Sequence, residues 1–86
     1  MSFMYDPAGD CALAEALFAS ELQASDTVTA ATIRAVVTAT LTRHGVDGCA
    51  GLVAYEFGEH PEVAVRRMAW ARRRVRDAFG ESLQPA

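Results

Sequence analysis

The chain has 86 residues, which is enough for one hydrophobic core and too few for two. Its hydrophobic fraction is 51%, and seventeen of those residues are alanine, a composition that suits close-packed helices better than a sheet. A net charge of −3 and a pI of about 5.2 exclude a protein that binds nucleic acid simply as a polycation.

The charge is unevenly distributed along the sequence. Residues 1–65 contain nine acidic residues and two arginines, a net charge of −7, whereas residues 66–86 contain six arginines and two acidic residues, a net charge of +4. All eight basic residues are arginine, and neither lysine nor asparagine occurs. We interpret this bias as the codon usage of a GC-rich bacterium.

Nothing in the sequence predicts a membrane or a secreted protein. Residues 1–10 lack the basic and apolar segments of a secretion signal, and no apolar run approaches the length of a membrane span. Cys11 and Cys49 are a single potential pair, not a disulfide framework. We therefore expect a cytoplasmic protein with reduced thiols and no membrane partner.

The first two predicted helices cover residues 10–24 and 27–44. Proline, glycine and aspartate before residue 11 are typical of a helix start, and Ser25 and Asp26 are expected to break the first helix and cap the second. In the second helix, Ile33, Val37 and Leu41 recur every four residues, and Gly45 is expected to end the helix in a left-handed conformation.

Two further helices are predicted over residues 48–58, capped by Asp47, and 61–79, ending at Gly80. Pro61 marks the boundary between them, because the residue before a proline avoids helical angles. The short connections predict a compact all-α four-helix domain over residues 1–86, with residues 1–9 and 80–86 as frayed tails.

The first predicted helix is apolar over an unusually wide arc. Leu13 and Leu17 lie on one side, and Cys11, Phe18 and Leu22 lie on another. A helix of this kind is either wedged among other helices or buried in a dimer.

The fourth predicted helix contains the most distinctive surface. Its inward stripe is expected to comprise small and apolar residues: Ala64, Met68, Ala71, Val75, Ala78 and Phe79. On a helical wheel Trp70 projects away from this stripe, and arginines flank it on both sides. Trp and Arg are enriched at interface hot spots, so the interaction candidates are Val63, Arg66, Arg67, Trp70, Arg73 and Arg74.

A purely structural interpretation of the arginines stays open beside this one. Glu62–Arg66 and Arg73–Asp77 are spaced as intrahelical ion pairs, and Arg74 can lie along Trp70. Arg67, Arg72 and Arg76 have no such partner, although Arg72 could pair with an acidic residue of another helix.

The sequence contains no convincing site for chemistry, so we predict no catalytic residue, no cofactor, no metal and no enzymatic activity. Cys49 lies on an apolar stripe and is expected to be a small buried residue, although a reactive thiol near a helix start is the alternative. Glu56 is expected at the edge of the core, in water or paired to arginine. The histidines and cysteines are scattered singly, unlike structural zinc ligands.

The sequence does not specify a function. Its best interpretation is a small cytosolic accessory or regulatory protein that acts through contact with another protein or with itself as a homodimer. The alternative is a weak nucleic-acid-binding module that uses the arginines of the fourth helix.

Overall fold

The computed structural model describes the backbone of residues 7–83 and the side chains of residues 11–80. Three helices make up this part of the chain: α1 (Pro7–Ala19), α2 (Ala30–Glu59) and α3 (Pro61–Leu83). The all-helical class is confirmed, whereas the predicted number of four helices is wrong. Of the predicted tail at 1–9, residues 7–9 are instead helical, because α1 begins at Pro7, and residues 1–6 and 84–86 lie outside the described residues.

The difference in helix number arises at Gly45. This residue has φ +72° and ψ 169°, so the expected positive φ is present although ψ is not that of a left-handed helical stop, and the residues on both sides are helical. The predicted second and third helices therefore form one element, α2, with a first arm (residues 30–44) and a second arm (residues 46–59). Glycine takes a positive φ without steric cost, so one residue is enough for the bend.

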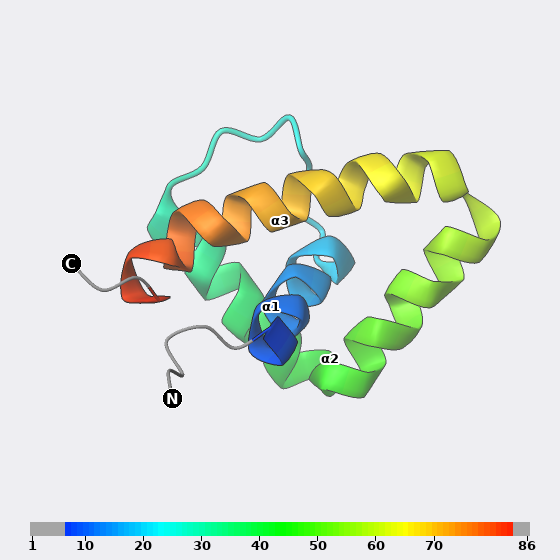
Figure 1. The fold of residues 1–86 in the computed structure, drawn as a ribbon, viewed down its shortest axis with the longest axis horizontal. Helices are drawn as coiled ribbons and strands as arrows, with labels where there is room; N and C mark the ends of the chain where they lie inside the picture. Colours follow the sequence, from blue (N-terminus) through cyan, green and yellow to red (C-terminus); the bar gives the residue numbers. More distant parts are fainter. Residues whose placement is uncertain (1–6, 84–86) are drawn as a thin grey trace.

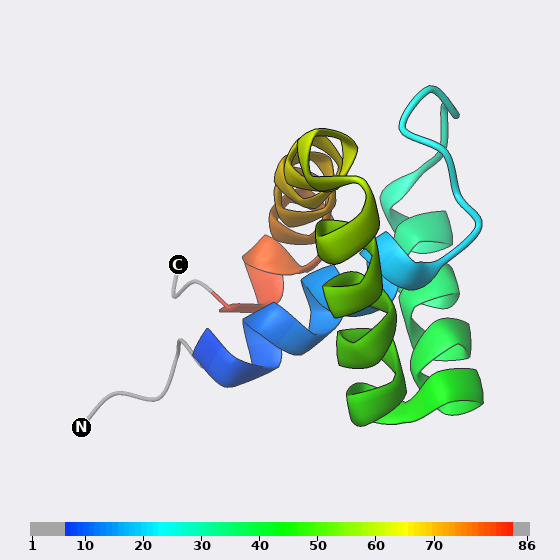
Figure 2. The same ribbon diagram turned by 90° about the vertical axis from the view of Figure 1, so that its right-hand side faces the viewer.

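The two arms of α2 and the whole of α3 form three sides of a triangle, and α1 lies through its middle (Figure 1). The view turned by 90° shows α1 passing between the first arm on one side and the second arm and α3 on the other (Figure 2). Contacts join every pair of the three helices. The radius of gyration, 12.7 Å, is close to the ~12 Å expected for a compact chain of this length.

This arrangement explains the wide apolar arc of α1. Its buried residues, Ala14, Ala16, Leu17 and Phe18, lie on several sides of the helix, because other helices surround it. Of the two explanations that the sequence left open, wedging within the monomer is confirmed. The apolar arc of α1 therefore gives no reason to expect a dimer.

The connection between α1 and α2 is longer than predicted. α1 ends at Ala19, and residues 20–29 are not helical. Ser20 ends the helix with its own side chain, since its Oγ donates to Leu17 O at 2.6 Å. Thr29, and not the expected Asp26, caps α2, because its Oγ1 accepts from Thr32 N at 3.1 Å.

The boundary at His60-Pro61 is confirmed, but the predicted end of the last helix is wrong. α3 continues through Gly80 to Leu83, so residues 80–83 are helical and not part of a frayed tail. A glycine ends a helix when it adopts a positive φ. Among the described residues, Gly45 is the one glycine that does so.

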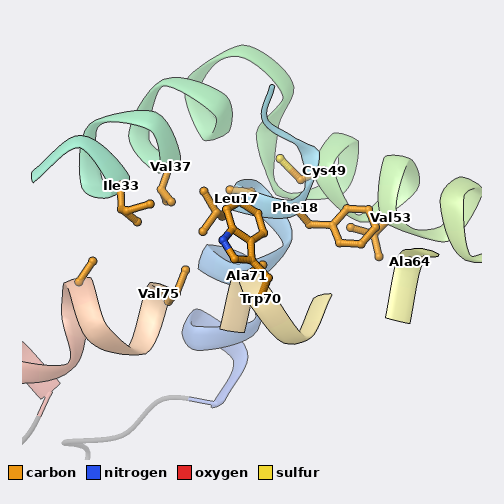
Figure 3. Packing of buried hydrophobic residues seen from close by; sticks show 12 residues of the cluster. Leu17, Phe18, Ile33, Val37, Cys49, Val53, Ala64, Trp70, Ala71 and Val75 are labelled. Carbon is orange, nitrogen blue, oxygen red and sulfur yellow. The ribbon is translucent and has the colours of Figure 1, made fainter. Parts of the chain in front are cut away.

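Side chains from all three helices meet in one core (Figure 3). Leu17 and Phe18 of α1 lie between the two arms of α2 and the buried side of α3. The buried apolar residues of the cluster are Ala16, Leu17, Phe18, Ile33, Val37, Cys49, Val53, Ala64, Trp70, Ala71, Val75 and Ala78.

Candidate functional site: the arginine helix

Trp70 belongs to the core and not to the surface. It is 7% exposed, and its indole lies beside Leu17 and Phe18 (Figure 3). The predicted outward direction of this side chain is therefore wrong. Compared with the inward stripe predicted from the sequence, the buried side of α3 is rotated about the helix axis toward Trp70 and away from Met68 and Phe79. These two residues are only partly buried.

Arg67 holds α3 to the end of α1. Its Nε donates to Phe18 O at 2.8 Å, and its Nη2 donates to Ser20 O and Leu22 O, both at 2.9 Å. The last carbonyls of a helix have no intrahelical donor, so an arginine fork is a suitable cap for them. The Arg67 side chain therefore has a structural role.

The guanidinium of Arg67 also lies against two aromatic rings. Its Cζ is 4.8 Å from the centroid of the Trp70 ring and 5.6 Å from that of Phe18. Burial lowers the pKa of Arg67, and the carboxylate of Glu56 acts in the opposite direction. An arginine stays charged in a protein at neutral pH even so, and these contacts are therefore cation–π contacts.

Two other arginines bind backbone carbonyls in the same way. Arg74 donates through Nη2 to Val28 O at 2.9 Å, which ties α3 to the connection before α2. Arg34 of the first arm donates through Nη1 to Ala78 O at 2.9 Å. Arginines thus link α3 to both of the other elements through hydrogen bonds.

The predicted intrahelical ion pairs of α3 are not formed. Among the side chains of residues 11–80, the one basic and acidic pair within 4 Å is His60 Nδ1 with Glu56 Oε1, at 3.2 Å, a contact that is an ion pair when the histidine is protonated and otherwise a hydrogen bond. Neither Glu62–Arg66 nor Arg73–Asp77 meets that distance. Glu56 is partly buried at the edge of the core, as expected, but its partner is a histidine and not an arginine.

The six interaction candidates therefore fall into two groups. Trp70, Arg67 and Arg74 are buried or partly buried, whereas Val63, Arg66 and Arg73 are exposed.

The sequence interpretation missed three residues of the outward side of α3: Val65, Arg72 and Arg76. All three are exposed, and Val65 is 58% exposed. At 100° per residue, Arg66, Arg72, Arg73 and Arg76 fall within an arc of roughly 120°. We call these four the basic face. Correct placement of the core stripe would have revealed it.

The basic face consists of arginines without a polar contact among the described side chains. No hydrogen bond or ion pair involves any of the four within residues 11–80. Val65 and the exposed Ala69 lie between these arginines on the helical wheel. Along the helix, Glu62 precedes the four arginines and Asp77 follows them. The face carries a formal charge of +4, or +2 with these two carboxylates.

The two cysteines have opposite environments. Cys49 is 1% exposed, and burial, with a smaller contribution from Glu15, raises the pKa of its thiol. The expectation of a small buried residue is confirmed. Cys11 is exposed, and both thiols are free.

No other feature of the described residues suggests a bound group. No three His, Cys, Asp or Glu side chains among them are grouped as metal ligands would be. Every buried side-chain nitrogen or oxygen among them has a hydrogen-bond partner. A surface hollow of about 390 Å³ lies between residues 19–26 and the first arm, and its lining includes Glu21, Asp26, Arg43 and His44.

None of the helices in the described part combines the length and the apolar character that crossing a membrane requires. Comparison of the chain with models of protein families, with curated proteins and with solved structures finds no match.

Proposed function

We propose that this chain is a small helical interaction protein that binds an acidic protein surface through the basic face of α3. The observation that carries the proposal is the set of four exposed arginines on one side of a helix, none of them with an ion-pair partner in the described structure. Arg67 and Arg74 are excluded from the binding surface, because they hold the fold together.

Clustered arginines repel one another, and no ion pair among the described side chains offsets this repulsion. Like charges at i,i+4 spacing, such as Arg72 and Arg76, destabilise a helix slightly. A carboxylate partner removes the repulsion and can accept two parallel hydrogen bonds from each guanidinium. Val65 and Ala69 add an apolar centre to such a contact.

A protein partner is favoured over a nucleic acid by the charge around the face. Glu62 and Asp77 border the face, and the chain as a whole has a net charge of −3. Four arginines make few phosphate contacts, and the affinity from such contacts falls steeply with salt. A protein surface presents its carboxylates singly, so the bordering Glu62 and Asp77 repel a protein partner less than they repel a nucleic acid.

The test compares two probes, one double arginine variant and one single-arginine control. Binding of a fluorescent glutamate-rich peptide and of a fluorescent DNA duplex is measured by anisotropy at low and physiological salt. We expect the peptide to bind more tightly at physiological salt, and Arg73→Ala with Arg76→Ala to weaken this binding.

The matched control is Arg43→Ala, which removes an exposed arginine of the first arm and should leave binding unchanged. Tighter binding of the duplex at physiological salt would replace the proposal with the nucleic-acid function. Binding that is insensitive to the Arg73 and Arg76 substitutions would overturn both.

A further inference from the structure

We propose that a second copy of this chain is an acidic partner of the basic face: α3 of one molecule docks on the second arm of α2 in the next. This inference rests on the proposed function, since it uses the same four arginines.

The second arm carries the charge opposite to that of α3. Residues 46–59 include three acidic residues and no basic one. Of the three, Asp47 and Glu59 are exposed, and neither forms an ion pair among the described side chains. The basic face and the second arm are therefore electrostatically complementary, and both face away from the core of their own molecule.

The second arm also exposes apolar surface. Tyr55 is 61% exposed and Leu52 is 41% exposed, although the same arm buries Cys49 and Val53 on its inner side. Large exposed apolar groups beside unpaired carboxylates are a suitable surface for an arginine-rich helix, since guanidinium groups stack on aromatic rings. Val65 and Ala69, at the centre of the basic face, provide its apolar counterpart.

The outer side of the second arm carries two glycines, which leave room for a helix to approach. Gly51 and Gly58 are exposed, and a Cβ placed on either would meet no atom within 4 Å. Packing within the molecule therefore does not require glycine at these positions, where glycine is destabilising relative to alanine. A helix of another molecule lying over them would use the space.

Charge also decides which surfaces meet. Contact of two second arms would bring carboxylates together, and contact of two basic faces would bring arginines together. Contact between the basic face of one copy and the second arm of another brings opposite charges together. The lengths agree: Arg66 to Arg76 covers ~15 Å of helix, and the second arm is ~21 Å long.

A contact between two different surfaces is heterologous, so a pair of molecules keeps one basic face and one second arm free for further copies. The association is expected to extend beyond a dimer and to weaken as salt increases, because its charged groups are solvent-exposed.

The test is sedimentation of the full chain across a concentration series at low and high salt. Two neutralised variants are compared with the wild type: Arg73→Gln with Arg76→Gln, and Asp47→Asn with Glu59→Gln. A control, Asp26→Asn with Arg43→Gln, changes exposed charges elsewhere, and circular dichroism verifies that each variant is folded.

We expect the mass of the wild type to rise with concentration at low salt, and each neutralised variant to associate roughly tenfold more weakly. A mixture of the two variants should form a one-to-one complex that does not grow further, since each contributes one intact surface. The control should behave as the wild type.

A wild type that stays monomeric throughout the concentration series overturns the inference, as does association that the neutralising substitutions do not change. These outcomes are separable from the proposed function. A monomer whose binding to the acidic peptide still depends on Arg73 and Arg76 removes the inference alone.

Discussion

Replacement of Arg67 by alanine should destabilise the fold more than replacement of any arginine of the basic face. The substitution removes three hydrogen bonds to the carbonyls of Phe18, Ser20 and Leu22 and two contacts with aromatic rings. It therefore breaks the direct link between α3 and the end of α1.

The expected loss is about 4 kcal/mol. A net hydrogen bond contributes about 1 kcal/mol when water can reach the abandoned acceptor, as it can at this partly buried site, and the cation–π contacts add about 1 kcal/mol. A chain of this length has a free energy of unfolding of roughly 4–13 kcal/mol. The variant should therefore melt at least about 15 °C below the wild type, or fail to fold.

The assay is urea or thermal unfolding followed by circular dichroism, with Arg73→Ala as the matched control. Arg73 is exposed and has no partner among the described side chains, so its removal should change the free energy of unfolding by less than about 0.5 kcal/mol. Arg67→Lys should fall between the two, because an ammonium keeps the charge but loses the fork. Equal stability of Arg67→Ala and Arg73→Ala would refute the structural role of Arg67.

Three further predictions follow from individual residues. Gly45→Ala should lower the free energy of unfolding by about 1–2 kcal/mol because of the positive φ, whereas Gly51→Ala, at a helical position with open space, should raise it by about 0.5–1 kcal/mol. Unfolding in urea measures both changes, and shifts of the same sign would contradict the different backbone conformations of the two glycines. Trp70 should fluoresce at short wavelength and resist quenching by acrylamide in a folded monomer, and an emission typical of solvent-exposed tryptophan would show that it lies outside the core. A thiol reagent should modify Cys11 rapidly and Cys49 slowly. Because burial raises the pKa of Cys49, its neutral thiol contributes fully to the free energy of unfolding below the ordinary thiol pKa, and this contribution is lost as the pH rises through the raised value. Cys49→Ala should therefore flatten the decline of the free energy of unfolding at alkaline pH.

Two local breaks of the fold are readable in the sequence. Pro61 excludes helical angles for His60, and this boundary depends on two adjacent residues alone. The positive φ of Gly45 was likewise predicted from its position after the apolar repeat of the first arm. The sequence could not show whether the chain would leave the helix there or re-enter it at once, since both begin with a glycine of positive φ.

The candidate site was predicted less well, because its parts depend on where α1 lies. A helical wheel orients α3 by its own apolar residues, and this placed Trp70 outside. In the folded chain, the side of α3 that is buried also depends on the residues of α1 that pack against it. The indole of Trp70 packs on Leu17 and Phe18 and is therefore buried.

By itself, the sequence determined an all-helical chain with its main breaks at Gly45 and Pro61 and with basic residues concentrated after residue 65. Only the tertiary structure decided which arginines are structural and which are free. The unpaired carbonyls at the end of α1 bind Arg67, 49 positions away from Phe18, and no local pattern encodes a contact of that separation. The arginines of α3 that no backbone carbonyl engages form the basic face.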